Sequence, residues 1–328
     1  MNEPVTRRNF LTATTVGLAS GMAQAAQEPR RALIAITLDL EMSRNFPAWE
    51  QTHWDFEKGN LNEETKRYAV EVCRRVRGHG GVVHCFAVGR VFEQENVDWL
   101  QGIIKAGHAV GNHTYDHVNV KAGSVEEVQF RFRRCPWLVE GRKLPDIIRD
   151  NIRLTTAAMR ARLGIAPAGF RTPGGFAMGL RDRPDVQQML LDLGFTWVSS
   201  LYPAHQMSQP GKEPAAEVFK SILQAQASAQ PFAYQRGLVE IPMSPVSDIG
   251  AFRNGRWHLK HFLRAVREGV EWAIENRTVF DFLAHPSCLY VTDPEFRTIE
   301  MICDLVRKAG DRAALVDLSA IAQRVKTR

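Results

Sequence analysis

The sequence predicts an α/β fold in which a parallel sheet or barrel alternates with helices. Short apolar runs of strand length alternate with longer segments that have helical amphipathic spacing, through most of the chain. The residues able to carry chemistry stand directly after several of the predicted strands, where the active sites of such folds gather. The length of 328 residues suits one large barrel or two ordinary domains.

The first predicted strand, residues 32–38, is a continuous apolar run that ends at Asp39. A helix is expected at 62–78, because Asn62 is a good N-cap, glutamates fill the first turn and arginines lie near the end. A further strand opens at Phe170, and the other predicted strands cover 81–88, 108–111, 195–199, 238–241, 279–284 and 313–316. The other predicted helices cover 97–106, 146–163, 184–193, 259–275 and 294–308, and two of them end at glycines, Gly164 and Gly194.

Two segments interrupt this alternation. Residues 202–231 are rich in Gln, Ala, Ser and Pro, and we expect them to form a long surface excursion. Residues 42–60 are predicted to form a second long loop close to the candidate site. In that loop, Trp49 and Trp54 could stack on the apolar faces of sugar rings, although simple packing of the loop would also explain them.

Composition narrows the classes of partner. The hydrophobic fraction of 45% fits a soluble protein with a substantial core. The formal net charge is +6, but the basic residues are scattered, which argues against nucleic-acid binding and allows a mild attraction to anionic polymers or membrane surfaces. The five cysteines form no Cys-x-x-Cys motif, so a zinc ribbon or redox pair is not expected, while one disulfide remains open.

The N-terminal residues have the pattern of an export signal. Arg7 and Arg8 precede Asn9, Phe10 and Leu11 in the manner of a twin-arginine signal, and small residues mark a cleavage site before Ala26. The apolar stretch between them is too short and polar to span a bilayer comfortably, so stable membrane insertion is not expected. We therefore predict a signal peptide at 1–25, a single catalytic domain at 26–328, and a periplasmic or extracellular location.

His113 and His117 are the most informative pair in the chain. Four residues apart on a helix, their imidazoles would project from one face and could bind one divalent metal. A carboxylate from Asp39 or Glu41 would be the third ligand, leaving a position where a bound water becomes acidic. The other carboxylate could act as base, and His285 as the acid for the leaving group. Arg171 could hold the base ionised, so these residues together predict metal-assisted amide or ester hydrolysis.

Across nearly all of the predicted mature chain, these motifs resemble those of the polysaccharide deacetylases with the NodB-homology domain. The resemblance implies a distorted (β/α)7 barrel in which Asp39 is the catalytic base and Glu41 a metal ligand, from the run Thr37-Leu38-Asp39-Leu40-Glu41. His113-Thr114-Tyr115-Asp116-His117 resembles the family's metal motif, and Arg171-Thr172-Pro173-Gly174-Gly175 the motif whose arginine positions the base. Leu283-Ala284-His285 resembles the closing motif that carries the acid, and Cys85-Phe86-Ala87-Val88-Gly89 the second-strand signature.

Three residues depart from the family pattern. Glu41 is one methylene longer than the usual aspartate, and Gly174 replaces a common aromatic, which opens one wall of the groove. Pro173 and Gly174 are therefore candidate substrate contacts. Val198 stands where we expect the aspartate that tunes the late histidine, and Asp281 or Asp248 could take its place.

The resemblance implies a metal-dependent enzyme that removes acetyl groups from N- or O-acetylated glycans, such as peptidoglycan or chitin-like oligomers. Zn is the expected metal, with Co, Mn or Ni as alternatives. Two other functions remain open: hydrolysis of a small non-sugar amide by an allantoinase-like or imidase-like enzyme, and a non-catalytic glycan-binding barrel. The sequence does not predict an oligomeric state.

Overall fold

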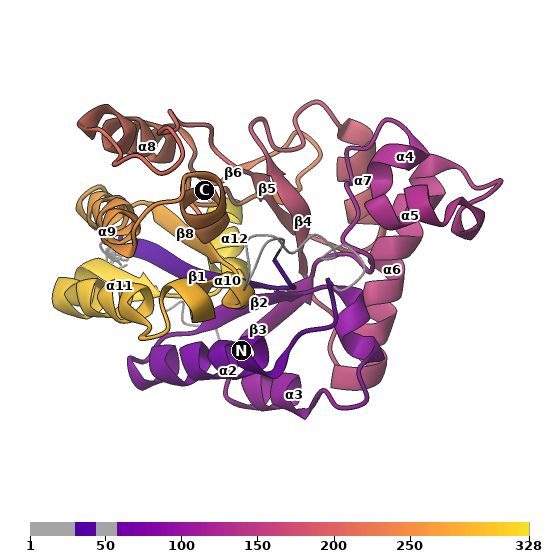
Figure 1. The fold of residues 1–328 in the computed structure, drawn as a ribbon, viewed down its shortest axis with the longest axis horizontal. Coiled ribbons are helices and arrows are strands. Elements are labelled where there is room, and N and C mark those ends of the chain that lie inside the picture. Colours follow the sequence, from indigo (N-terminus) through magenta and orange to yellow (C-terminus); the bar gives the residue numbers. More distant parts are fainter. Residues whose placement is uncertain (1–29, 44–57, 328) are drawn as a thin grey trace, which may run out of the picture. The chain divides into compact units, whose positions relative to one another are not determined.

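The computed structural model describes residues 30–43 and 58–327 (Figure 1). Residues 31–328 form one compact unit. The expected signal at 1–25 lies outside the described residues, as do Trp49 and Trp54. None of the helices within the described ranges is both long and apolar enough to cross a membrane.

The described part of the chain contains one nine-stranded sheet. The strands β7, β5, β4, β3, β2, β1 and β8 lie side by side in that order and run parallel, β6 is antiparallel to β7 at one edge, and β9 pairs with β1. Their bounds are Ala32–Leu40 (β1), Val83–Ala87 (β2), Ala109–Asn112 (β3), Gly169–Phe176 (β4), Trp197–Leu201 (β5), Phe232–Ala233 (β6), Val239–Glu240 (β7), Val279–Ala284 (β8) and Ala313–Leu315 (β9). The expected barrel-type α/β fold is confirmed.

Helices surround the curled sheet (Figure 1). Among the described residues, the helices are Glu63–Gly78 (α2), Asp98–Lys105 (α3), Val125–Val128 (α4), Phe130–Arg134 (α5), Leu144–Leu163 (α6), Pro184–Asp192 (α7), Ala216–Ser228 (α8), Leu259–Glu275 (α9), Pro286–Thr292 (α10), Arg297–Ala309 (α11) and Leu318–Lys326 (α12). Shorter helical turns cover Gly89–Glu93 (η1), Pro136–Leu138 (η2), Ile249–Asn254 (η3) and Gly310–Arg312 (η4). The Asn62 side chain caps α2 by accepting from the Thr65 amide at 2.9 Å, as predicted.

Side chains alternate along β1 because successive residues of a strand point to opposite faces. Leu33 and Ala35 belong to a cluster inside the curled sheet, which α12 completes with Leu318 and Ile321. The intervening residues belong to the main core between the sheet and its outer helices: Ile34, Ile36, Leu38 and Leu40. Thr37, Asp39 and Glu41 continue the inner row, so the alternation brings polar groups to the carboxyl end of the inner face.

The segment after β7 connects that strand to β8. The Ser244 amide donates to the Asp281 carbonyl at 2.8 Å, and the Leu283 amide donates to Ser244 Oγ at 3.4 Å. These bonds link the two ends of the row of parallel strands. The inner face is consequently enclosed at this level, and residues from β7 to β8 can meet those from β1 and β3.

Two expectations were wrong. Residues 202–231 are not simply a surface excursion, because they contain α8, which packs Val218, Phe219 and Ile222 into the main core. The histidine pair does not lie on a helix: His113 and His117 follow β3 in an irregular loop. All five cysteines lie within the described ranges as free thiols, and all except Cys135 are buried.

Candidate active site

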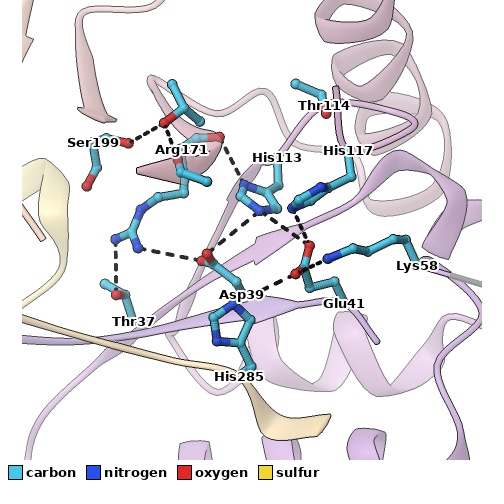
Figure 2. A network of polar contacts seen from close by, with 12 residues as sticks. Thr37, Asp39, Glu41, Lys58, His113, Thr114, His117, Arg171, Ser199 and His285 are labelled. Carbon is cyan, nitrogen blue, oxygen red and sulfur yellow. Dashed lines mark hydrogen bonds and ion pairs between the residues drawn. The ribbon is translucent and has the colours of Figure 1, made fainter. Parts of the chain in front are cut away.

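Four strands, β1, β3, β4 and β8, bring the predicted site residues to one end of the sheet (Figure 2). Asp39 ends the inner row of β1, with Glu41 just beyond, and His113 and His117 follow β3. Arg171 lies within β4, beneath the site, and His285 directly follows β8. A cavity of about 770 Å³ is lined by Asp39, Glu41, His113, His117 and His285.

One carboxylate and two imidazoles converge at this cavity. Ligand atoms of Glu41, His113 and His117 all lie within 4.8 Å of one another. Glu41 Oε2 is 2.6 Å from His117 Nε2 and 3.7 Å from His113 Nε2. Two nitrogens and one oxygen are a donor set typical of a divalent metal in a hydrolytic site.

The surroundings of the two histidines also suit metal binding. His113 Nδ1 lies 3.0 Å from the Arg171 carbonyl oxygen, which can only accept, so Nδ1 carries the proton and Nε2 presents its lone pair to the cavity. Burial lowers the pKa of His113 well below its usual value and also lowers the pKa of His117. Both imidazoles are thus disposed to be neutral, the form that binds metal.

Lys58 is a site residue that the sequence did not reveal. Its buried ammonium donates to Glu41 Oε1, leaving Oε2 to face the two histidines. Burial works to raise the pKa of Glu41, but the neighbouring His117 and Lys58 outweigh it and hold that pKa well below its usual range. Lys58 belongs to no recognisable motif, so only the folded chain shows its pairing with Glu41.

Arg171 is shared between two carboxylates. Its buried guanidinium donates from Nη2 to Asp281 Oδ2 at 2.8 Å and to Thr37 Oγ1 at 3.0 Å. Nη1 lies 3.6 Å from Asp39 Oδ1. Burial raises the pKa of Asp39 to about 6, even though Arg171 works to lower it. A carboxylate with such a pKa can accept a proton near neutral pH.

His285 has its own carboxylate partner, Asp248. Asp248 Oδ1 lies 2.9 Å from His285 Nδ1, and Oδ2 accepts from the His285 amide at 2.7 Å. Burial works to lower the pKa of His285, but the Asp248 charge outweighs it and the pKa is raised. Val198 packs in the outer core cluster between the sheet and α7, so its position could not serve His285. Of the two substitutes considered, Asp248 contacts the histidine and Asp281 holds Arg171.

Of the two candidate substrate contacts within the described residues, Pro173 and Gly174, one lines the cavity and the other does not. Gly174 lines the cavity, with φ of 69° in the left-handed region that favours glycine. Pro173 is not among the residues that line it. The cavity is also lined by residues that the sequence did not single out: Tyr202, His205, Met207, Met243, Ile249 and Arg253.

Comparisons with known proteins agree with this fold. The family model described as polysaccharide deacetylase matches residues 55–197. A chitooligosaccharide deacetylase from Azorhizobium caulinodans is 37% identical over 60 residues, which cover 18% of this chain and 28% of that protein. The matched region is thus a minor part of the curated relative.

Solved structures share the whole fold at low identity. A predicted polysaccharide deacetylase from Mycobacterium smegmatis matches with a TM-score of 0.59 and 16% identity, covering 92% of each chain. One from Pseudomonas aeruginosa PAO1 matches with a TM-score of 0.59 and 10% identity, over 90% of this chain and 91% of that one. An allantoinase matches with a TM-score of 0.60 and 10% identity, over 95% and 98%. Residues 55–197 thus match the polysaccharide deacetylase model, and the chain shares its fold with these solved structures.

Proposed function

We propose that this protein is a metal-dependent hydrolase that removes acetyl groups from N- or O-acetylated glycans. The observation that carries the proposal is the presence of Asp39 and His285, each with its own charged partner, on the cavity that also receives the Glu41, His113 and His117 donors. The family match and the chitooligosaccharide deacetylase relative support an acetylated sugar as substrate.

Each residue has a distinct part in the proposed reaction. Glu41 Oε2 and the Nε2 atoms of the two histidines would hold the metal. When bound, a divalent ion such as Zn, Co, Mn or Ni polarises the acetyl carbonyl and makes water a better nucleophile. Asp39 takes the proton of the attacking water, and the Arg171 guanidinium beside it favours the ionised carboxylate. His285 donates a proton to the departing nitrogen or oxygen as the bond to the acetyl carbon breaks, while Asp248 stabilises the imidazolium.

Hydrolysis of a small non-sugar amide is the second candidate. The cavity volume of about 770 Å³ is within the range typical of pockets for small molecules, which favours a compact substrate. A non-catalytic glycan-binding barrel is disfavoured, because Asp248 gives His285 the carboxylate partner that Val198 cannot supply. We therefore favour an enzyme.

Hydrolysis of two substrate panels tests the proposal. Protein treated with a chelator would be assayed for acetate release from acetylated glycans and for ring opening of small cyclic amides, with and without added Zn²⁺ or Co²⁺. We expect metal-dependent acetate release, which the Asp39→Asn variant lacks. Activity on cyclic amides alone would favour the second candidate, and no activity on either panel by metal-loaded protein would contradict both.

We further propose that the protein is exported to the periplasm or beyond. The adjacent arginines Arg7 and Arg8 support this location. Replacing both with lysine should retain the protein in the cytoplasm, and cell fractionation would reveal the change. Unaltered fractionation of that variant would count against twin-arginine export.

A further inference from the structure

We propose that Asp116 is a positioning residue that orients His117 for metal binding. Asp116 lies immediately before His117 and is almost wholly buried. The inference rests on the proposed function, because it assumes that His117 binds the metal. It assigns a role to a residue that is neither a ligand nor a proton carrier in that proposal.

The two histidines are held in different ways. The His113 ring is fixed by its contact with the Arg171 carbonyl. The backbone amide of His113 donates to the Ala87 carbonyl at 3.2 Å. Within the described ranges, the polar contact of the His117 ring is with Glu41, which is itself a proposed ligand. The direction of the His117 ring therefore depends on the backbone that carries it.

That backbone adopts an unfavourable conformation. Thr114 and His117 both have φ of 59°, in the left-handed region that residues other than glycine rarely adopt. The Thr114 amide donates to Asn112 Oδ1 at 2.8 Å, and Thr114 Oγ1 accepts from the Val118 amide at 2.9 Å. These two bonds restrain the first turn of the loop.

Asp116 supplies a further restraint by joining three elements. Its Oδ1 accepts from Arg90 Nε of η1 at 2.7 Å and from Arg131 Nη1 of α5 at 2.6 Å. Its amide donates to Asn151 Oδ1 of α6 at 2.8 Å. A buried carboxylate between two guanidiniums forms strong, directional hydrogen bonds. The residue next to His117 is thus fixed to the scaffold from three sides.

Asp150 offers a matched control. Like Asp116, it pairs with two arginines, Arg142 and Arg153. It lies in α6 with about a third of its side chain exposed, and these partners belong to neither the histidine loop nor η1. Removing it deletes a similar ion-pair cluster without touching the backbone of His117.

Metal binding by the full-length protein tests the role of Asp116. Wild type, Asp116→Ala and Asp150→Ala would be stripped with a chelator and titrated with Zn²⁺, and the visible spectrum of bound Co²⁺ would report the ligand geometry. We expect Asp116→Ala to bind Zn²⁺ about 10- to 100-fold more weakly and to change the Co²⁺ spectrum, as is typical when a supporting partner of a ligand is lost. Asp150→Ala should resemble wild type in both measurements.

Three outcomes would overturn the role of Asp116. Wild-type affinity in Asp116→Ala would show that His117 needs no such support, and equal weakening in Asp150→Ala would indicate general destabilisation. Should Asp116→Ala fail to fold, Arg131→Gln removes one arm of the cluster, and unchanged Zn²⁺ affinity in that variant would also overturn the proposal. Failure of wild type to bind either metal would instead contradict the proposed function, and this inference with it.

Discussion

At the scale of single residues, each group proposed to move a proton is paired with a charged residue from a distant part of the chain. Asp39 lies 3.6 Å from Arg171, whose other guanidinium nitrogen is bonded to Asp281. The Asp281 carboxylate shares the charge of Arg171, which helps explain why the pKa of Asp39 stays raised, at about 6. Different surroundings therefore shift the pKa values of the two carboxylates in the Asp39-Leu40-Glu41 run in opposite directions: that of Asp39 is raised and that of Glu41 is lowered.

Substitutions at these two carboxylates should separate their roles. Asp39→Asn should retain one metal per chain but lose about 10²- to 10⁴-fold in rate, because the base is lost. Glu41→Gln should lose metal as well as activity. Elemental analysis with the acetate-release assay would measure both, and metal loss in Asp39→Asn with retention in Glu41→Gln would reverse the assignment.

The pairing of Asp248 with His285 predicts a pH dependence. A general acid must be protonated, and the Asp248 charge raises the pKa of His285. Asp248→Asn removes that charge, so the pKa of His285 should fall and the alkaline limb of the activity profile should move to lower pH. Amides should lose more rate than activated esters, whose leaving groups need little protonation. An unmoved alkaline limb would argue against His285 as the acid.

At the scale of elements, β7 is held to β5 by a buried carboxylate. Glu240 Oε1 accepts from the amides of Ser200 and Leu201 at 2.7 and 2.9 Å. Its Oε2 accepts from Ser200 Oγ at 2.5 Å and from the Tyr234 hydroxyl, Oη, at 2.7 Å. Because β7 is only two residues long, this side chain replaces bonds that a longer strand would form with its backbone.

Glu240 should also make stability depend on pH. Burial raises the pKa of this carboxyl above its usual value, despite the hydrogen bonds that favour its charge. Between the unfolded and folded pKa values the unfolded chain has lost this proton and the folded chain keeps it, so this group's contribution to stability falls as pH rises through that range. The free energy of unfolding of Glu240→Gln, relative to wild type, should therefore increase from acidic to neutral pH. Urea unfolding at several pH values would measure it, and a constant difference would contradict the expectation.

At the scale of the whole 31–328 unit, closing the sheet brings residues far apart in sequence to one cavity. The bonds from Ser244 to β8 complete the enclosure near the site. At the other end, α12 packs Leu318 and Ile321 against inner residues of β1 and β8, including Leu33 and Val279. Helix α12 therefore belongs to the interior packing of the sheet.

The packing of α12 can be tested with two substitutions on that helix. Leu318 is fully buried, so Leu318→Ala should lower the free energy of unfolding by about 2–5 kcal/mol through lost burial and a residual cavity. Gln323 is exposed on the same helix, so Gln323→Ala should stay within about 0.5 kcal/mol of wild type. Chemical unfolding measures both, and equal effects would show that α12 is not part of the core.

Much of this architecture could be predicted because it depends on neighbours in sequence. The run at 32–38 became β1, Asn62 capped α2, and Gly164 ended α6 with φ of 70°. The placement of Asp39, His113 and His285 was equally predictable, because the carboxyl ends of parallel strands meet at one edge of the sheet. Periodicity did not predict α8 or α12. Helix α8 lies in a segment rich in Gln, Ala and Ser, and α12 is too short for its apolar spacing to be distinctive.

Local patterns could not show which charged groups would meet. Val198 stood at the expected position, yet the twofold alternation of β5 turned it toward the outer helices, and Asp248 reached His285 from another segment. The contacts of Lys58 with Glu41 and of Asp116 with Arg90 and Arg131 likewise join separate elements. The residues and their order along the strands are local properties of the chain. Their pairing and pKa values arise only when folding excludes water and brings distant charges together.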